Sequence, residues 1–78
     1  MDKASKKKLE DARHHISLAS GLIDQVRDDA QTTFDEETDK WKESAIGLDA
    51  DEKLAYLQQA IDELESVDAC IDQATTGE

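Results

Sequence analysis

Apolar residues recur along the first half of the chain at alternating intervals of three and four positions. The series consists of Leu9, Ala12, Ile16, Ala19, Ile23, Val26 and Ala30. These intervals are those of the a and d positions of a heptad repeat, where one helix buries an apolar seam against another. No proline occurs among the 78 residues, so proline bars no segment from being helical. The sequence therefore predicts an all-α, coiled-coil-like fold.

A second amphipathic segment lies toward the C-terminus. Its apolar face consists of Leu54, Leu57, Ala60, Ile61, Leu64, Val67 and Ile71. Gly47 suits the end of the preceding helix, and Asp49 suits the N-cap of the following one. Two amphipathic helices joined by a short turn form an antiparallel hairpin.

We therefore predict one helical-hairpin domain over residues 1–78, with a long first helix. Its segments are a basic, frayed N-terminal end at 1–8, a first helix at 9–46, a turn at 47–50, a second helix at 51–73 and a tail at 74–78. The continuity of the first helix is the open point. Thr33-Phe34-Asp35-Glu36 matches a capping box, which favours a break with a short second helix carrying Trp41. Phe34 follows Ala30 by four positions and keeps the apolar face in phase, which favours one long helix, straight or kinked near Thr33.

The first helix is expected to be longer than the second, which leaves part of its apolar seam uncovered. An exposed aliphatic stripe of this kind is typical of an interface, and a short chain with few aromatic residues gains stability from oligomerisation. We predict a dimeric four-helix arrangement. The residues expected at its interface are Leu9, Ile16, Ile23 and Val26.

Charge is distributed unevenly along the chain. Residues 1–13 hold five basic and three acidic side chains, whereas residues 14–78 hold four basic and seventeen acidic ones, for a net charge of −11. Such a body repels nucleic acids and anionic membranes and attracts basic protein surfaces. The lysines of segment 3–8 could contact phosphates, but the acidic body argues against direct nucleic-acid binding. We predict a protein partner with a basic surface and no membrane association.

An acidic stretch runs from Asp24 to Asp39, with Arg27 as its sole basic residue. On a helix, Asp24, Asp28 and Asp35 lie close to one strip, and further acids flank it. Carboxylates along a rigid rod can imitate a phosphate backbone; the alternative is a solvated acidic face. The predicted partner-binding residues are Asp24, Asp28, Asp29, Asp35, Glu36, Glu37 and Trp41. Trp41 serves either as an interface anchor or as a cap on the hairpin core.

Patterns that would indicate catalysis are missing from the sequence. It contains no glycine-rich phosphate loop and no nucleophile set. Neighbouring helix positions such as His14 and His15 point about 100° apart, which disfavours chelation of one metal. The single Cys70 cannot form an internal disulfide, and no apolar run has the length of a membrane span or signal peptide. We predict a cytoplasmic protein that is not an enzyme and uses no cofactor or metal.

Segment 31–68 resembles small helical-hairpin proteins carried by phages, prophages and plasmids. The resemblance rests on the Phe34-Asp35 step, the acidic stretch, Glu43-Ser44 before the turn and Ala60-Ile61-Asp62-Glu63-Leu64-Glu65 in the return helix. That family usually has a proline in the connection, and this chain has none, so the turn is expected to differ. By similarity of charge and setting, the resemblance implies an inhibitor of the anti-CRISPR or anti-restriction kind.

These observations lead to one functional expectation and two alternatives. The expected function is that of a non-enzymatic acidic protein-binding module, specifically a mobile-element inhibitor that blocks a nucleic-acid-binding host protein by DNA mimicry. One alternative is a structural helical-hairpin protein that only oligomerises. The other is a small DNA-associated regulator that uses the lysine-rich N-terminus.

Overall fold

The computed structural model describes residues 1–76, which form three helices: α1 (Lys3–Glu36), α2 (Asp39–Glu43) and α3 (Ala45–Thr75). No strand occurs in this described part, and the predicted all-α class is confirmed. The last two residues of the predicted tail, 77 and 78, lie outside the described residues.

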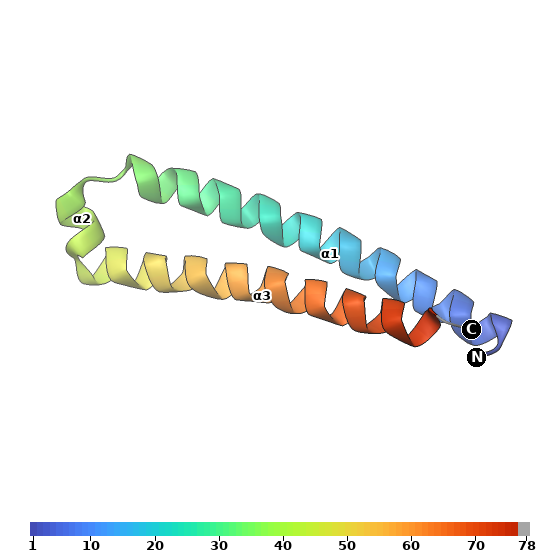
Figure 1. Ribbon diagram of the computed structural model, residues 1–78. Helices are drawn as coiled ribbons and strands as arrows, with labels where there is room; N and C mark the ends of the chain where they lie inside the picture. Colours follow the sequence, from blue (N-terminus) through green and yellow to red (C-terminus); the bar gives the residue numbers. More distant parts are fainter. Residues whose placement is uncertain (77–78) are drawn as a thin grey trace.

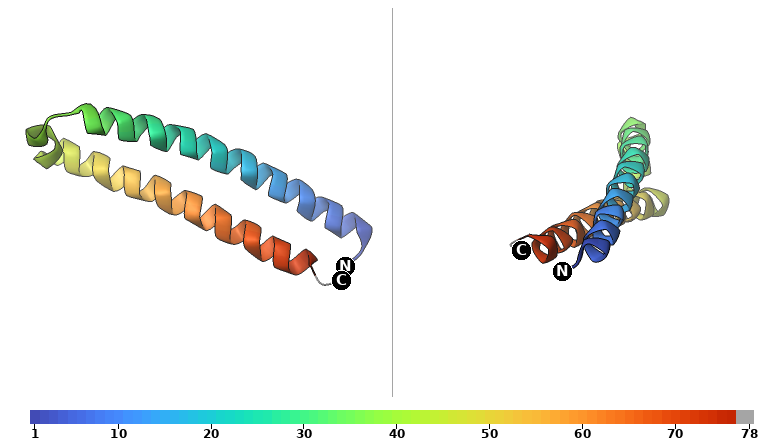
Figure 2. Two further views of the ribbon diagram at one scale, coloured as in Figure 1. Left: turned by 45° about the horizontal axis from the view of Figure 1, so that its top comes forward. Right: turned by 90° about the vertical axis from the view of Figure 1, so that its right-hand side faces the viewer.

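The two long helices run side by side in opposite directions, with α2 joining them at one end and both termini at the other (Figure 1). The resulting rod measures 57 × 15 × 14 Å. Seen end-on, α1 and α3 cross at an angle rather than lying strictly parallel (Figure 2, right). The first helix is the longer one, as predicted, with 34 residues in α1 against 31 in α3. The difference is only three residues, so the prediction of a much longer first helix with a large overhang is wrong.

The N-terminal end begins its helix earlier than predicted. Asp2 is the N-cap of α1, and its carboxylate accepts a hydrogen bond from the backbone N–H of Ser5 at 2.7 Å. This backbone bond lowers the pKa of Asp2. A negative cap suits the positive end of the helix dipole, which the lysines that follow oppose. Segment 1–8, expected to be frayed, is therefore helical from Lys3 onward.

The connection between the long helices lies at 37–44, not at the predicted turn 47–50. Glu37 and Thr38 are extended, and the Thr38 hydroxyl caps α2 by accepting from the N–H of Trp41. Ser44 then caps α3 by accepting from the N–H of Gly47 at 3.2 Å. Thr33, the cap suggested by the sequence, lies inside α1 and donates to the Asp29 carbonyl. Of the two alternatives, a break with a short helix carrying Trp41 is the one observed, about one turn later than expected.

Gly47 has a different role from the predicted helix end. It lies buried in the first turn of α3, where a Cβ atom would stand 2.2 Å from the carbonyl oxygen of Trp41 and 2.6 Å from Cα of Lys42. The missing side chain therefore allows the backbone of α2 to approach α3 closely.

The core is thin, because each long helix can bury only the side that faces the other. Leu54 and Ile61 are the buried apolar side chains of the described chain, and α1 contains no fully buried residue. Leu9, Ile16 and Ile23 are half-buried on the side of α1 that packs against α3. The fourth residue of the predicted interface, Val26, is exposed.

Candidate partner-binding surfaces

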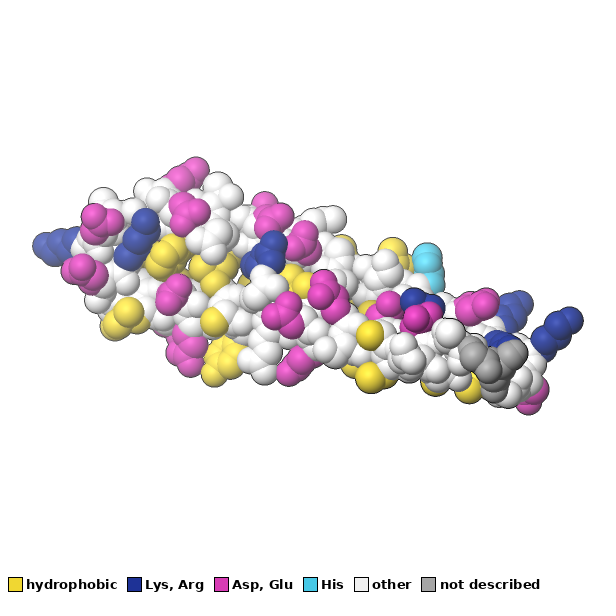
Figure 3. Space-filling view, in the orientation of Figure 1, with side chains coloured by type: hydrophobic (Ala, Val, Ile, Leu, Met, Phe, Trp, Pro, Cys, Tyr) yellow, Lys and Arg dark blue, Asp and Glu magenta, His cyan; other side chains and the backbone are white. Residues whose placement is uncertain are grey.

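Acidic side chains from both long helices lie on the face of the rod that Figure 3 shows. We call this side the polar face; its acids, placed by their contacts with Arg27, Gln31 and Gln58 and by the depressions that they line, are Asp24, Asp28, Asp35, Asp51, Asp62 and Glu65. Asp28 and Asp51 line one shallow depression of this face together with Arg27 and Gln58, which places acids of α1 and α3 on the same side. The contribution of α3 was missed from the sequence, although its acids recur beside the apolar seam.

Arg27 lies at the centre of the acidic strip on α1. Its guanidinium contacts the carboxylates of Asp24 at 2.8 Å and Asp28 at 3.0 Å, and it donates across the interface to the Gln58 side chain. The hydrogen bond to Asp28, together with the attraction of Asp24 and Asp62, raises the pKa of Arg27. Part of the predicted strip is therefore already paired with a cation.

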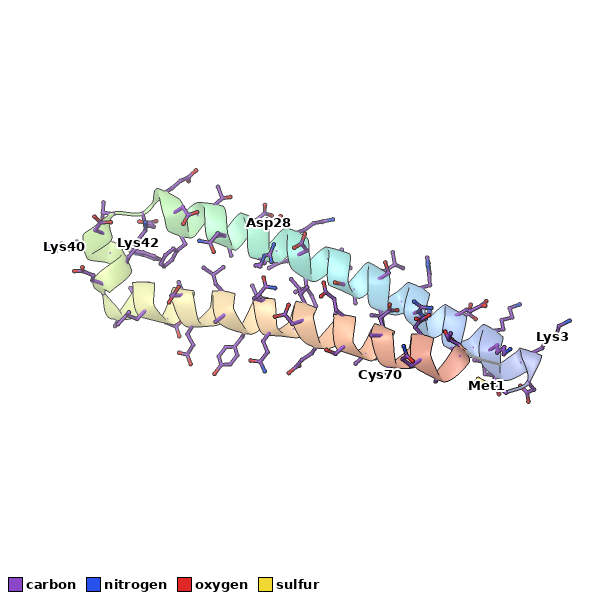
Figure 4. The ribbon with its side chains drawn as sticks, in the orientation of Figure 1. Met1, Lys3, Asp28, Lys40, Lys42 and Cys70 are labelled. Atoms are coloured by element: carbon purple, nitrogen blue, oxygen red, sulfur yellow. The ribbon has the colours of Figure 1, made fainter. Side chains whose placement is uncertain are left out.

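The predicted partner-binding residues do not all lie on one surface. Asp24, Asp28 and Asp35 share the polar face, and Asp35 accepts a hydrogen bond from Gln31 at 2.9 Å. Figure 4 labels Asp28 on α1. Asp29 instead lines an apolar groove beside Trp41. Glu36 is the last residue of α1 and Glu37 its C-cap. The set is thus divided among the polar face, the groove and the helix end.

Arg13 joins the N-terminal part of α1 to the C-terminal part of α3. Its Nε donates to Asp68 Oδ1 at 2.9 Å and its Nη2 to Oδ2 at 3.2 Å, while Nη1 reaches Asp72 at 3.2 Å. This two-pronged bond lowers the pKa of Asp68 and raises that of Arg13. The sequence gives no sign of this pair, because its partners are 55 residues apart.

Basic residues lie at both tips of the rod, with the acidic body between them. Figure 4 shows Lys3 at the terminal end and Lys40 and Lys42 at the turn end. The Lys42 ammonium lies 5.5 Å from the centre of the Phe34 ring, a cation–π contact. Only the N-terminal lysines were expected from the sequence to form a basic end; the second basic tip was not predicted.

An open apolar groove of 440 Å³ lies at the turn end. Its lining residues are Val26, Asp29, Ala30, Thr33, Phe34, Trp41 and Ala50. Trp41 is half-buried and meets Phe34 edge-on, with ring centres 5.9 Å apart and planes at 69°. Trp41 therefore caps the core at the turn end, which was one of its two predicted roles.

Residues 1–76 show neither a metal-binding cluster nor a membrane-spanning helix. This part contains no group of three His, Cys, Asp or Glu side chains that could hold a metal ion. The rings of His14 and His15 are 6.1 Å apart and tilted, and Cys70 is exposed with a free thiol. None of the helices in the described chain combines the length and apolar character needed to cross a bilayer.

Comparison of the chain with family models, characterised proteins and solved structures finds no match. The resemblance to mobile-element proteins therefore stays a prediction. The polar face and the apolar groove are therefore the candidate functional surfaces of the chain.

Proposed function

We propose that the protein is a non-enzymatic binding module whose polar face engages a basic surface on a protein partner. The observation that carries the proposal is that the two long helices direct acids to the same side of one rod. A net charge of −11 adds a long-range attraction for basic surfaces, which speeds encounter with them.

Within this class we propose a mobile-element inhibitor that acts by DNA mimicry. Residues four apart on a helix rise by about 6 Å, and two such rows approach the charge spacing of a nucleic-acid strand, about 3.4 Å per phosphate. Most of the carboxylates that take the place of phosphates would be those that Arg27 does not contact, such as Asp35, Asp51 and Glu65. The partner is then a host protein that binds nucleic acid, and the proposed location is the cytoplasm.

The dimer belongs to the same proposal: two hairpins form a four-helix arrangement that leaves both polar faces outward. A purely structural role is the second candidate, and the large exposed apolar side chains favour it. A regulator that uses the lysine tip on DNA is the third candidate. It is supported only by the exposed Lys3, Lys7 and Lys8.

The test compares two double charge reversals of equal net charge. Asp28→Lys with Asp35→Lys alters the polar face. The control, Asp11→Lys with Glu63→Lys, alters exposed acids that lie two positions from Arg13 and from the buried Ile61 and therefore point away from the neighbouring helix. The immobilised chain is used to capture partners from a lysate of its native host at low and high salt.

We expect the wild type and the control to retain a partner at low salt and to lose it at high salt. The polar-face variant should retain none, and duplex DNA should release the partner from the wild type. Retention of the partner by the polar-face variant would refute the proposal. Release by salt but not by duplex DNA would refute the mimicry and leave the acidic binding module in place.

A further inference from the structure

Large apolar side chains remain exposed along the middle of both long helices. On α1 they are Leu18, Leu22 and Val26, spaced by four residues and therefore on one ridge. On α3 they are Tyr56 and Val67. These five side chains are between 46% and 63% exposed, and we call the surface they form the apolar face.

The apolar face lies on the opposite side of the rod from the polar face. Residues two apart on a helix point about 200° apart. Val26 precedes Asp28 by two positions, and Tyr56 precedes Gln58 by two; both Asp28 and Gln58 line the depression on the polar face. Val67 follows Glu65 in the same way. Val26 also lines the apolar groove, which therefore opens on the apolar side.

The rod exposes more surface than a folded monomer of its size. The structure has an accessible area of 5877 Å². A monomer of 8.7 kDa is expected to expose about 4,700 Å². The excess, roughly 1,200 Å², is more than the ~800 Å² that each partner buries in an interface of standard size.

The apolar face is also arranged symmetrically about its own centre. The Arg13–Asp68 and Arg27–Gln58 contacts fix the register of α1 against α3. In this register Leu22 lies level with about Ile61, midway between Tyr56 and Val67 along α3. A two-fold axis at Leu22 would place Leu22 against its own copy and Leu18 against the copy's Val26. The same axis would place Tyr56 against the copy's Val67.

We propose that a second copy of this chain covers the apolar face, with a two-fold axis passing near Leu22. This inference rests on the dimer in the proposed function and assigns its contact residues. It differs from the seam predicted from the sequence, since Leu9, Ile16 and Ile23 are already used against α3. A second copy is the occupant whose apolar residues match this face across the axis, and both polar faces stay accessible in the dimer.

The first test is the molar mass in solution, measured by light scattering during size-exclusion chromatography. The wild type should have twice the 8.7 kDa mass of one chain. Leu22→Glu combined with Val26→Glu should halve that mass while the helical circular dichroism is kept. Leu48→Glu is the control for Leu22→Glu alone, because Leu48 is 61% exposed against 63% for Leu22. Leu48 precedes the buried Leu54 by six residues, so it points about 120° away from the side of α3 that faces α1. This control should remain dimeric.

Cysteine cross-linking tests the axis without relying on a destabilising charge. In a Cys70→Ser background, Leu22→Cys should form a covalent dimer on oxidation, and Leu48→Cys should stay a monomer on a denaturing gel. A monomeric wild type, a dimeric Leu22→Glu/Val26→Glu variant, or equal cross-linking at both positions would overturn the proposal. A monomeric wild type would instead favour a different protein as the occupant of the face.

The effect of salt concentration distinguishes the proposed dimer from the proposed binding of a basic partner. Added salt screens the repulsion between two acidic chains and should strengthen the dimer, whereas it should weaken capture of a basic partner. A salt-sensitive partner retained by a monomeric wild type would overturn the dimer alone. A dimer that captures no partner would overturn the binding function alone.

Discussion

Replacing Gly47 by alanine should destabilise the fold, although alanine is the better helix former. The new Cβ would stand 2.2 Å from the Trp41 carbonyl oxygen, and real Cβ contacts essentially never fall below 3.0 Å. The opposing atoms belong to the backbone of α2, so they cannot rotate away as the end of a side chain would. The connection between α2 and α3 must therefore open by roughly 1 Å, a shift comparable to those that overpacking forces on a protein core.

The size of the effect follows from two opposing contributions. Overpacking of this kind costs about 1–3 kcal/mol, and a rigid backbone neighbour favours the upper part of that range. Alanine stabilises a helix by up to about 1 kcal/mol relative to glycine. A net loss of about 2 kcal/mol would be a large fraction of the stability of a chain this short, about 4–12 kcal/mol.

Gly21 provides the matched control within the same chain. It is exposed in the middle of α1, and a Cβ there would meet nothing within 4 Å. Gly21→Ala should therefore stabilise the protein by about 0.5–1 kcal/mol. Each kcal/mol shifts the Tm of a domain this size by about 4–8 °C, so the two variants should bracket the wild type.

Thermal and urea unfolding followed by circular dichroism at one protein concentration measures both changes. A fixed concentration matters because self-association would make the Tm depend on it. A Gly47→Ala protein as stable as Gly21→Ala would refute the close approach of α2 to α3. Destabilisation by both substitutions would show instead that Gly21 also has a close neighbour, such as a second chain.

Two further predictions concern single contacts. Because Arg13 lowers the pKa of Asp68 below its ordinary value of 3.8, the folded chain releases this proton more readily than the unfolded chain. The contribution of this contact is therefore complete above that value and is lost as the pH falls through the lower folded pKa. Asp68→Asn should lower the Tm at pH 7 and have little effect near pH 2; an equal loss at both pH values would contradict the ion pair. Ser44→Ala should cost about 1 kcal/mol through loss of the α3 cap, while Ser66→Ala on the exposed side of α3 should change the Tm little.

The helical class and the buried seam were predictable because periodicity reports which side of a helix is covered. Leu54 and Ile61, the most buried side chains of the described chain, both belong to the face read from the sequence. Val26 shows the limit of that reading. After Ile23, the position of α1 that faces α3 is occupied by Arg27 and not by Val26. An arginine in that position leaves no hydrophobic signal in the sequence.

The position of the connection could not be chosen from local sequence. Thr33, Thr38 and Ser44 all offer the same hydroxyl to a helix N-terminus. The choice depends on a tertiary contact, because the break at Thr38 allows Trp41 to meet the ring of Phe34. The Arg13–Asp68 pair could not be predicted from the sequence either, since it depends on the register of two helices that are far apart in the sequence.

The clustering of acidic side chains on the polar face links the stability of the helical pair to the proposed binding. Like charges four apart destabilise a helix by some tenths of a kcal/mol per pair, and acids of the two helices also face each other across the polar face. Arg13 pairs with two acids of α3, and Arg27 lies among acids of both helices, so these two cations offset part of this repulsion within the chain. A basic partner would offset the remainder, and binding to the polar face would therefore stabilise the helical pair itself. Asp29 is an acid on the groove of the opposite face, so contact with an equally acidic copy there depends on the apolar side chains that surround it.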